Sequence, residues 1–189
     1  MGLAGRLMAP VRGSATLHAG PVRDVDTLRE FLRAYHRELL LPIELPAIYR
    51  AWSHATRNEF SELAAFDRSL LNEPRLGRLA KASQLVGRRE LRRFRPLKDV
   101  RFVQRYLSAL EREDVNAWHT LVYGVSIWVF SLPLQQGLLG YARQVTRGFI
   151  AAAAEETSLS EAESRNLFTE FAGALNDKVP RTLTSEVAW

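Results

Sequence analysis

The sequence predicts an all-α protein, a single-domain bundle of about eight helices. Apolar residues recur at three- and four-residue spacing along most of the chain, which is the spacing of one buried helix face. No run alternates convincingly with the two-residue period of a half-buried strand. At 189 residues with 47% hydrophobic residues, the chain is long enough to bury one substantial core.

The chain is expected to have three parts. Residues 1–22 predict a loose N-terminal arm, because their arginines are scattered among small residues without the continuous apolar region of a secretory signal. Residues 23–178 predict the helical domain, and residues 179–189 a C-terminal tail. Internal repeats, low-complexity tracts and linkers are absent from the sequence, which favours one domain.

Capping residues and prolines mark the first three helices. Asp24 or Asp26 can cap the first helix, and Pro42 is expected to close it. Pro46 lies at the start of the second helix, and Asn58 can cap the third. The apolar positions at helical spacing include Leu28, Leu32, Tyr35 and Leu39 in the first helix, Ile48 and Trp52 in the second, and Leu63 and Leu70 in the third.

The next three helices are bounded in the same way. Pro74 opens a fourth helix that breaks at residues 94–96, because the residue before a proline is disfavoured in the α region. Asp99 is expected to cap the fifth helix and Asn116 the sixth, which ends before Pro133.

Two further helices complete the bundle. The seventh follows Pro133 directly, with apolar residues at helical spacing as far as Ala153. Ser160 followed by Glu163 forms the pattern of a capping box, which starts the last helix.

The most apolar run, Leu121 to Leu134, is too short to cross a membrane. A bilayer span needs about 20 apolar residues, whereas Pro133 stops this run and serine and glycine interrupt it. We therefore expect a helix buried on all sides and no membrane interaction.

Positive charge is concentrated between Arg75 and Arg105. This stretch holds eleven of the 26 Lys and Arg residues but only Glu90 and Asp99 among the acidic ones, so the net charge of +5 is a local feature. Such a concentration predicts an acidic counterpart, because like charges on one surface repel and add no stability.

The predicted fourth helix separates its charges cleanly from its apolar residues. Projection of residues 74–94 places the cations on one half and the apolar residues on the other, where Ser83 and Gly87 would let a neighbouring helix approach closely. An ordinary solvated face is the alternative, although such faces usually mix both signs. The candidate partner-binding residues are Arg75, Arg78, Lys81, Arg88, Arg89, Arg92 and Arg93.

Two other binding functions are alternatives to protein docking. A basic helical protein can bind nucleic acid, since clustered Lys and Arg neutralise phosphates, but no helix-turn-helix glycine turn, zinc-knuckle spacing or RNP-type motif accompanies the charge. Nucleic acid is therefore the weaker candidate. A small-molecule site beneath the apolar sixth helix is the other alternative.

The sequence contains no recognisable catalytic, cofactor-binding or metal-binding site. It has no cysteine, which fits a reducing compartment such as the cytoplasm, and it lacks G-x-S-x-G and P-loop motifs. None of the four histidines lies three or four residues from another, and His119, beside the apolar run, is the one expected to be partly buried. A non-enzymatic role is expected.

The order of these features resembles the urease accessory protein UreF family over roughly residues 19–170. The strongest likeness is at Arg75 to Leu91. Within it, residues 82–89, Ala-Ser-Gln-Leu-Val-Gly-Arg-Arg, resemble the family's pattern of a small residue, Ser, three variable positions, Gly and a basic residue. Residues 44–51 resemble its Leu-Pro helix start, and 123–125 with 132–134 a later segment.

This resemblance implies a helical scaffold without an active site or cofactor that assists maturation of the urease nickel metallocentre. It also implies homodimerisation through apolar helix faces and, as partners, the accessory proteins UreD (also called UreH) and the GTPase UreG. Residues 13–18, 157–161 and 180–189 depart from the family pattern in regions through which the family engages partners. A divergent relative that serves another enzyme remains an alternative.

Overall fold

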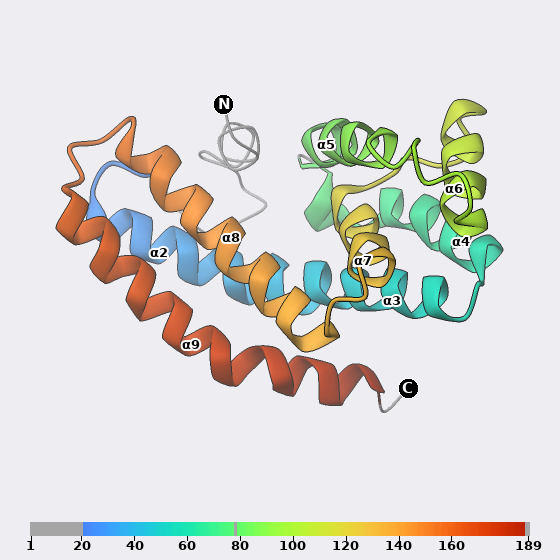
Figure 1. Cartoon of the computed structure of the whole chain (residues 1–189). Coiled ribbons are helices and arrows are strands. Elements are labelled where there is room, and N and C mark those ends of the chain that lie inside the picture. Colours follow the sequence, from blue (N-terminus) through green and yellow to red (C-terminus); the bar gives the residue numbers. More distant parts are fainter. Residues whose placement is uncertain (1–20, 78, 188–189) are drawn as a thin grey trace. The chain divides into compact units, whose positions relative to one another are not determined.

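The computed structural model describes residues 21–77 and 79–187 (Figure 1). The arm expected at 1–22 lies outside these residues apart from its last two positions. All regular elements in the described range are helical, without a strand, which confirms the all-α prediction. The helices are α2 (Val25–Tyr35), α3 (Leu45–Thr56), α4 (Phe60–Ser69), α5 (Ala80–Arg92), α6 (Arg101–Glu111), α7 (His119–Val129), α8 (Leu134–Ala154) and α9 (Glu161–Val187). A π-helix, η1 (His36–Glu44), and two short 3₁₀ helices, η2 (Leu70–Asn72) and η3 (Pro74–Leu76), join them.

Contacts divide the described residues into two compact units. Unit 1 comprises residues 21–46 and 135–187, and unit 2 comprises residues 47–77 and 79–134. The tail expected at 179–189 begins inside α9, which continues to Val187. None of the helices in the described residues is long and apolar enough to cross a membrane.

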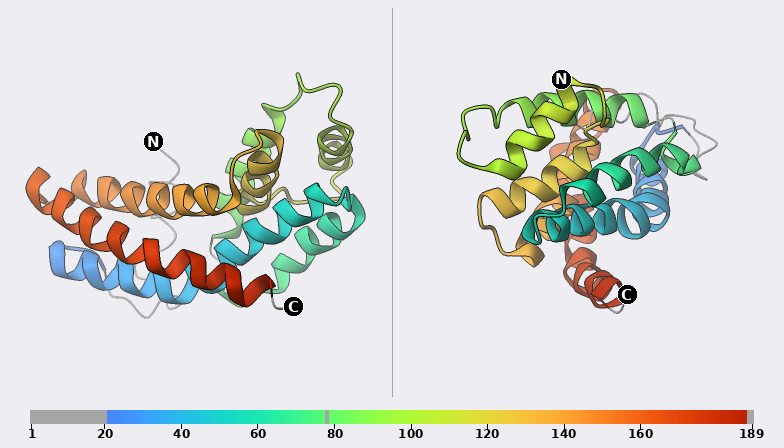
Figure 2. Two further views of the ribbon diagram at one scale, coloured as in Figure 1. Left: turned by 60° about the horizontal axis from the view of Figure 1, so that its bottom comes forward. Right: turned by 90° about the vertical axis from the view of Figure 1, so that its right-hand side faces the viewer.

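In unit 1, α2, α8 and α9 run side by side (Figure 2). Aromatic contacts join them: the ring of Phe31 on α2 meets that of Phe149 on α8, and the ring of His36 on η1 meets that of Phe171 on α9. Of the two candidates for the first cap, Asp24 is the one that caps α2, where it forms a capping box with Thr27. The capping box predicted at Ser160 with Glu163 is present at the start of α9.

The expectation that Pro42 closes the first helix is wrong. Pro42 lies inside η1, which continues α2 directly into α3. In an α-helix the proline ring would clash with the carbonyl four residues earlier, whereas a π-helical turn is wider and bonds residues five apart, as Leu45 N–H does to Leu40 O. The wider turn accommodates the proline.

Unit 1 also buries a carboxyl group between two tyrosines. The Tyr35 hydroxyl donates to Glu44 Oε2 at 2.5 Å and the Tyr141 hydroxyl donates to the same oxygen at 3.3 Å. Burial raises the pKa of Glu44 to about 7, although both hydrogen bonds oppose the rise. Nearby, His36 Nε2 lies 2.9 Å from Thr146 Oγ1, and burial lowers the pKa of His36 to about 4.

In unit 2, α7 contacts α3, α5 and α6. Its apolar sequence is explained by this position, since seven of its residues are buried. The expected burial on all sides is met only in part, because the other four residues of α7 are partly exposed. Gly124 faces α3 so closely that a Cβ there would lie 2.4 Å from Ile48 O. The ring of Trp128 meets Phe102 of α6. Pro133 ends this segment, as predicted, and α8 follows at once.

Three expected caps in unit 2 are wrong. Asn58 does not cap α4 but ends α3: its φ is 57°, and the bonds from Asn58 N–H to Ala55 O and from Glu59 N–H to His54 O form a left-handed C-terminal motif. Asp99 and Asn116 also make no cap, because α6 and α7 begin after Val100 and Trp118, neither of which makes a side-chain cap bond.

Candidate protein-docking surface

Helix α5 carries most of the candidate residues, and its inner side is held tightly against the start of α7. A Cβ at Gly87 would lie 1.9 Å from Ala117 O and 2.7 Å from His119 N, so only glycine permits this approach. The Ser83 hydroxyl accepts a hydrogen bond from His119 N–H at 3.1 Å. The close approach predicted at Ser83 and Gly87 is therefore confirmed. The expected burial of His119 is confirmed as well, and it lowers the pKa of that side chain to about 4.

The segment that receives α5 is itself fixed by Asp67 of α4. The fully buried carboxylate accepts hydrogen bonds from Asn116 N–H at 2.5 Å and from Ala117 N–H at 2.9 Å. The Tyr106 hydroxyl donates to it at 3.3 Å, and Trp118 Nε1–H donates to the Asp67 carbonyl at 3.0 Å. Burial raises the pKa of Asp67, and the hydrogen bonds that it accepts oppose the rise. This network holds residues 116–118, and through them α5, in one position.

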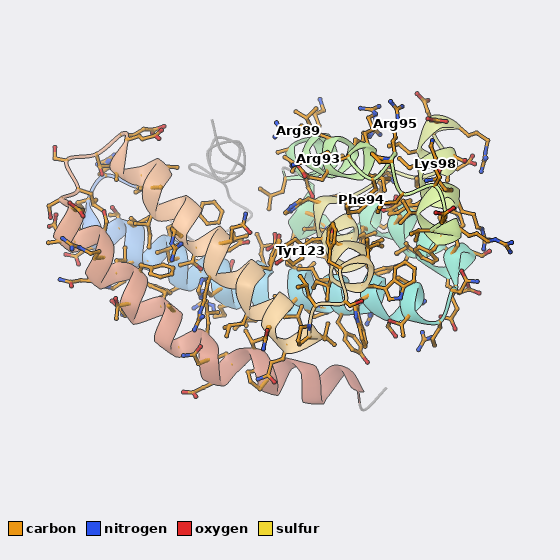
Figure 3. The ribbon with its side chains drawn as sticks, in the orientation of Figure 1. Arg89, Arg93, Phe94, Arg95, Lys98 and Tyr123 are labelled. Carbon is orange, nitrogen blue, oxygen red and sulfur yellow. The ribbon has the colours of Figure 1, made fainter. Side chains whose placement is uncertain are left out.

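The outer side of α5 presents positive charge to solvent. Lys81, Arg89, Arg92 and Arg93 are exposed, and we call these four residues the cationic face. Figure 3 shows Arg89 on α5 and Arg93 directly after its last residue, with Arg95 and Lys98 on the segment that follows. Because the start of α7 occupies the inner side, the cationic face is the side of α5 that faces solvent.

The other three candidate residues do not belong to this face. The expected helix over 74–94 is wrong at its start, because residues 74–76 form the separate 3₁₀ helix η3 and α5 begins only at Ala80. Arg75 lies in η3 and pairs with Glu73 at 2.7 Å. Arg78 lies outside the described residues. Arg88 is half-buried, and its Nε–H donates to Asn116 O at 3.2 Å, so it anchors α5.

Intramolecular carboxylates neutralise only part of the cationic face. Glu90 lies 3.0 Å from Arg93 and 3.6 Å from Arg89, so two guanidinium groups share one carboxylate. Within the part of the chain that the structure describes, Lys81 and Arg92 form no ion pair. The face therefore keeps a net positive charge.

Sequence reasoning missed an exposed leucine within this face. Leu85 is 56% exposed and lies one helical turn after Lys81 and one before Arg89. The signal was present in the four-residue spacing of these three positions, which places them in one row along the helix. Other exposed apolar side chains in unit 2 are Leu71, Phe130 and Leu132.

Among the described residues, no group of three or more His, Asp or Glu side chains is arranged to hold a metal ion. Arginine and lysine on a helix fixed from behind can form charge-assisted hydrogen bonds to carboxylates or phosphates.

Comparison with known proteins gives one match. The model of the UreF family matches residues 22–160, which is more than half of the chain. No curated protein and no solved structure matches.

Proposed function

Because this chain belongs to the UreF family of urease accessory proteins, we propose that it is a non-catalytic scaffold that docks protein partners through its cationic face. The accessory role in urease maturation follows from family membership. The observation that carries the docking proposal is the contrast within α5, whose inner side is locked by Gly87 and Ser83 while its outer side carries four exposed cations.

The proposed partners are UreD (UreH) and the GTPase UreG, as the resemblance to the family implies. We also propose a homodimer, in which the apolar side chains of Phe130 and Leu132 are candidates for burial because both are about half exposed in the single chain. Light scattering after size-exclusion chromatography measures the dimer. A strictly monomeric protein at high micromolar concentration would contradict it.

A protein partner fits this surface better than nucleic acid. Surfaces that bind single-stranded nucleic acid combine cations with aromatic rings that stack on bases, and α5 contains no aromatic residue. Aromatic rings next to α5 are engaged elsewhere: Phe94 is buried and meets the ring of Phe130.

The test is charge reversal on the cationic face. A variant carrying Lys81→Glu, Arg89→Glu and Arg92→Glu should bind UreD and UreG at least about tenfold more weakly, because attraction becomes like-charge repulsion. Its helicity and unfolding midpoint should stay near those of the wild type, since surface charge pairs contribute little to stability. Arg88 stays unchanged because it bonds to the Asn116 carbonyl.

The control variant makes the same change in charge elsewhere. Arg33, Arg37 and Arg165 are exposed in unit 1, and their replacement by Glu alters the net charge by the same amount. Affinities are measured by biolayer interferometry at one fixed salt concentration. If both triple variants weaken binding equally, net charge alone is responsible and the cationic face has no special role.

A further inference from the structure

An exposed leucine lies in the middle of a row of cations on α5, and a surface that serves only solubility needs no apolar residue there. Lys81, Leu85 and Arg89 repeat every four residues along α5, and Arg92 lies seven residues after Leu85, on the same side. Such a row spans three helical turns, with Leu85 near its centre. Protein interfaces have this composition, an apolar centre surrounded by charged residues at the rim.

We propose that Leu85 is the apolar anchor of this face, and that the partner segment is acidic and amphipathic. An apolar side chain of the partner covers Leu85, and carboxylates on either side meet Lys81, Arg89 and Arg92. This inference rests on the proposed function and specifies the chemistry of the segment that docks there.

Charge complementarity determines the acidic character of that segment. Lys81 and Arg92 lack a carboxylate partner within the described residues, and Arg89 shares Glu90 with Arg93. Covering these cations with a neutral or basic segment would remove their hydration without a compensating ion pair, which costs free energy. A segment with carboxylates at the rim satisfies the cations and still buries Leu85.

Leu85 also distinguishes a protein partner from a nucleic acid as the ligand of this face. Against a nucleic-acid backbone, an exposed leucine at the centre would lie where another cation would bind better. Replacement of Leu85 by lysine therefore has opposite effects in the two cases. It strengthens binding that depends on charge alone, and it weakens binding that depends on apolar contact.

The decisive experiment compares Leu85→Lys with Leu71→Lys. Leu71 is 57% exposed and lies in η2, so the two variants add the same charge at equally exposed leucines. Leucine and lysine have similar helix propensities, which keeps α5 folded, and circular dichroism verifies this. The probes are purified UreD and UreG, titrated against each variant at fixed salt.

We expect Leu85→Lys to weaken partner binding by about tenfold or more, and Leu71→Lys to leave it within about twofold. Unchanged or tighter binding by Leu85→Lys overturns the anchor but leaves the docking function in place if the charge reversal still weakens binding. Absence of any complex with the wild-type chain overturns both. Tighter binding of Leu85→Lys to labelled duplex or single-stranded nucleic acid, without any protein complex, assigns the face to phosphates instead.

A photo-cross-linker at position 85 identifies the docked segment. With benzoylphenylalanine in place of Leu85, mass spectrometry of the complex should find the link on an apolar residue with Asp or Glu within about four positions on both sides. Links that fall on basic or neutral segments overturn the proposed chemistry of the partner.

Discussion

Replacement of Gly87 by alanine should destabilise the protein, although the same change stabilises most helices. The added Cβ would lie 1.9 Å from Ala117 O, 2.7 Å from His119 N and 2.8 Å from Trp118 C. All three are backbone atoms of the segment held by Asp67, so none can rotate away. Helix α5 must therefore move by about 1.5 Å to restore an ordinary van der Waals contact.

The expected loss follows from three contributions. Overpacking of a tightly packed contact costs about 1–3 kcal/mol. Movement of α5 also lengthens the 3.1 Å hydrogen bond between His119 N–H and Ser83, which is worth about 1 kcal/mol. The helix propensity of alanine returns about 1 kcal/mol. We expect the free energy of unfolding to fall by about 2 kcal/mol.

Gly173 provides the matched control. It lies in α9, and no atom would come within 4 Å of a Cβ added there. Gly173→Ala should raise the free energy of unfolding by about 0.5–1 kcal/mol. Urea unfolding followed by far-ultraviolet circular dichroism measures both variants at one protein concentration. Equal effects of the two substitutions would show that the close approach of α5 to residues 117–119 is not present in solution.

Three further predictions concern buried and capping groups. Asp67→Asn leaves one of the N–H groups that face its carboxylate without an acceptor and should cost about 2 kcal/mol in urea unfolding; an unchanged midpoint would contradict the network. The pKa of Glu44 rises from 4.5 to about 7 on folding, so the folded protein holds the proton of this carboxyl more tightly than the unfolded chain does. The stability that this proton contributes is fully present below pH 4.5 and is lost as the pH rises to about 7. The wild type should therefore lose up to about 3 kcal/mol relative to Glu44→Gln over this range, and parallel pH profiles of the two proteins would refute the shift. Ser160→Ala removes the cap of α9 and should cost about 1 kcal/mol, whereas an unaltered melting temperature would argue against the cap.

Local signals in the sequence predicted much of the fold. The capping box at Ser160, the break at Pro133 and the close packing at Ser83 and Gly87 were predicted correctly, and Asp24 was one of the two residues proposed to cap α2. Each of these signals acts within one or two helical turns, or requires only that some neighbour be close. Helical periodicity alone was enough for the all-α class.

The same kind of signal failed where a distant contact competes for the residue. Asn116 has a side chain suited to capping, but its N–H and its amide both bond to Asp67, 49 positions earlier in the chain. Pro42 has the chemistry of a helix terminator, but the wider turn of η1 accommodates it. A tertiary contact therefore decided the role of Asn116, whereas at Pro42 the hydrogen-bonding pattern of the helix itself changed.

The candidate site shows the same division. Charge density along the chain located α5 and four of the residues of its outer side, because like charges do not become buried without partners. Arg75 is not part of the cationic face because it lies in η3 and pairs with Glu73. Arg88 is not part of it because its side chain bonds to Asn116 O. The distribution of charge along the sequence predicts neither outcome. The exposure of Leu85 depends on which side of α5 meets α7.

The sequence by itself determined that this chain is helical, that its positive charge is concentrated within residues 75–105 and that Ser83 and Gly87 permit close packing of one helix. These properties depend on residue type and short-range spacing, which are present in every conformation of the chain. Only the tertiary structure decided which polar residues cap helices, which cations anchor α5 and which leucine remains exposed. Those outcomes require partners dozens of residues apart, whose contacts exist only after the chain has folded.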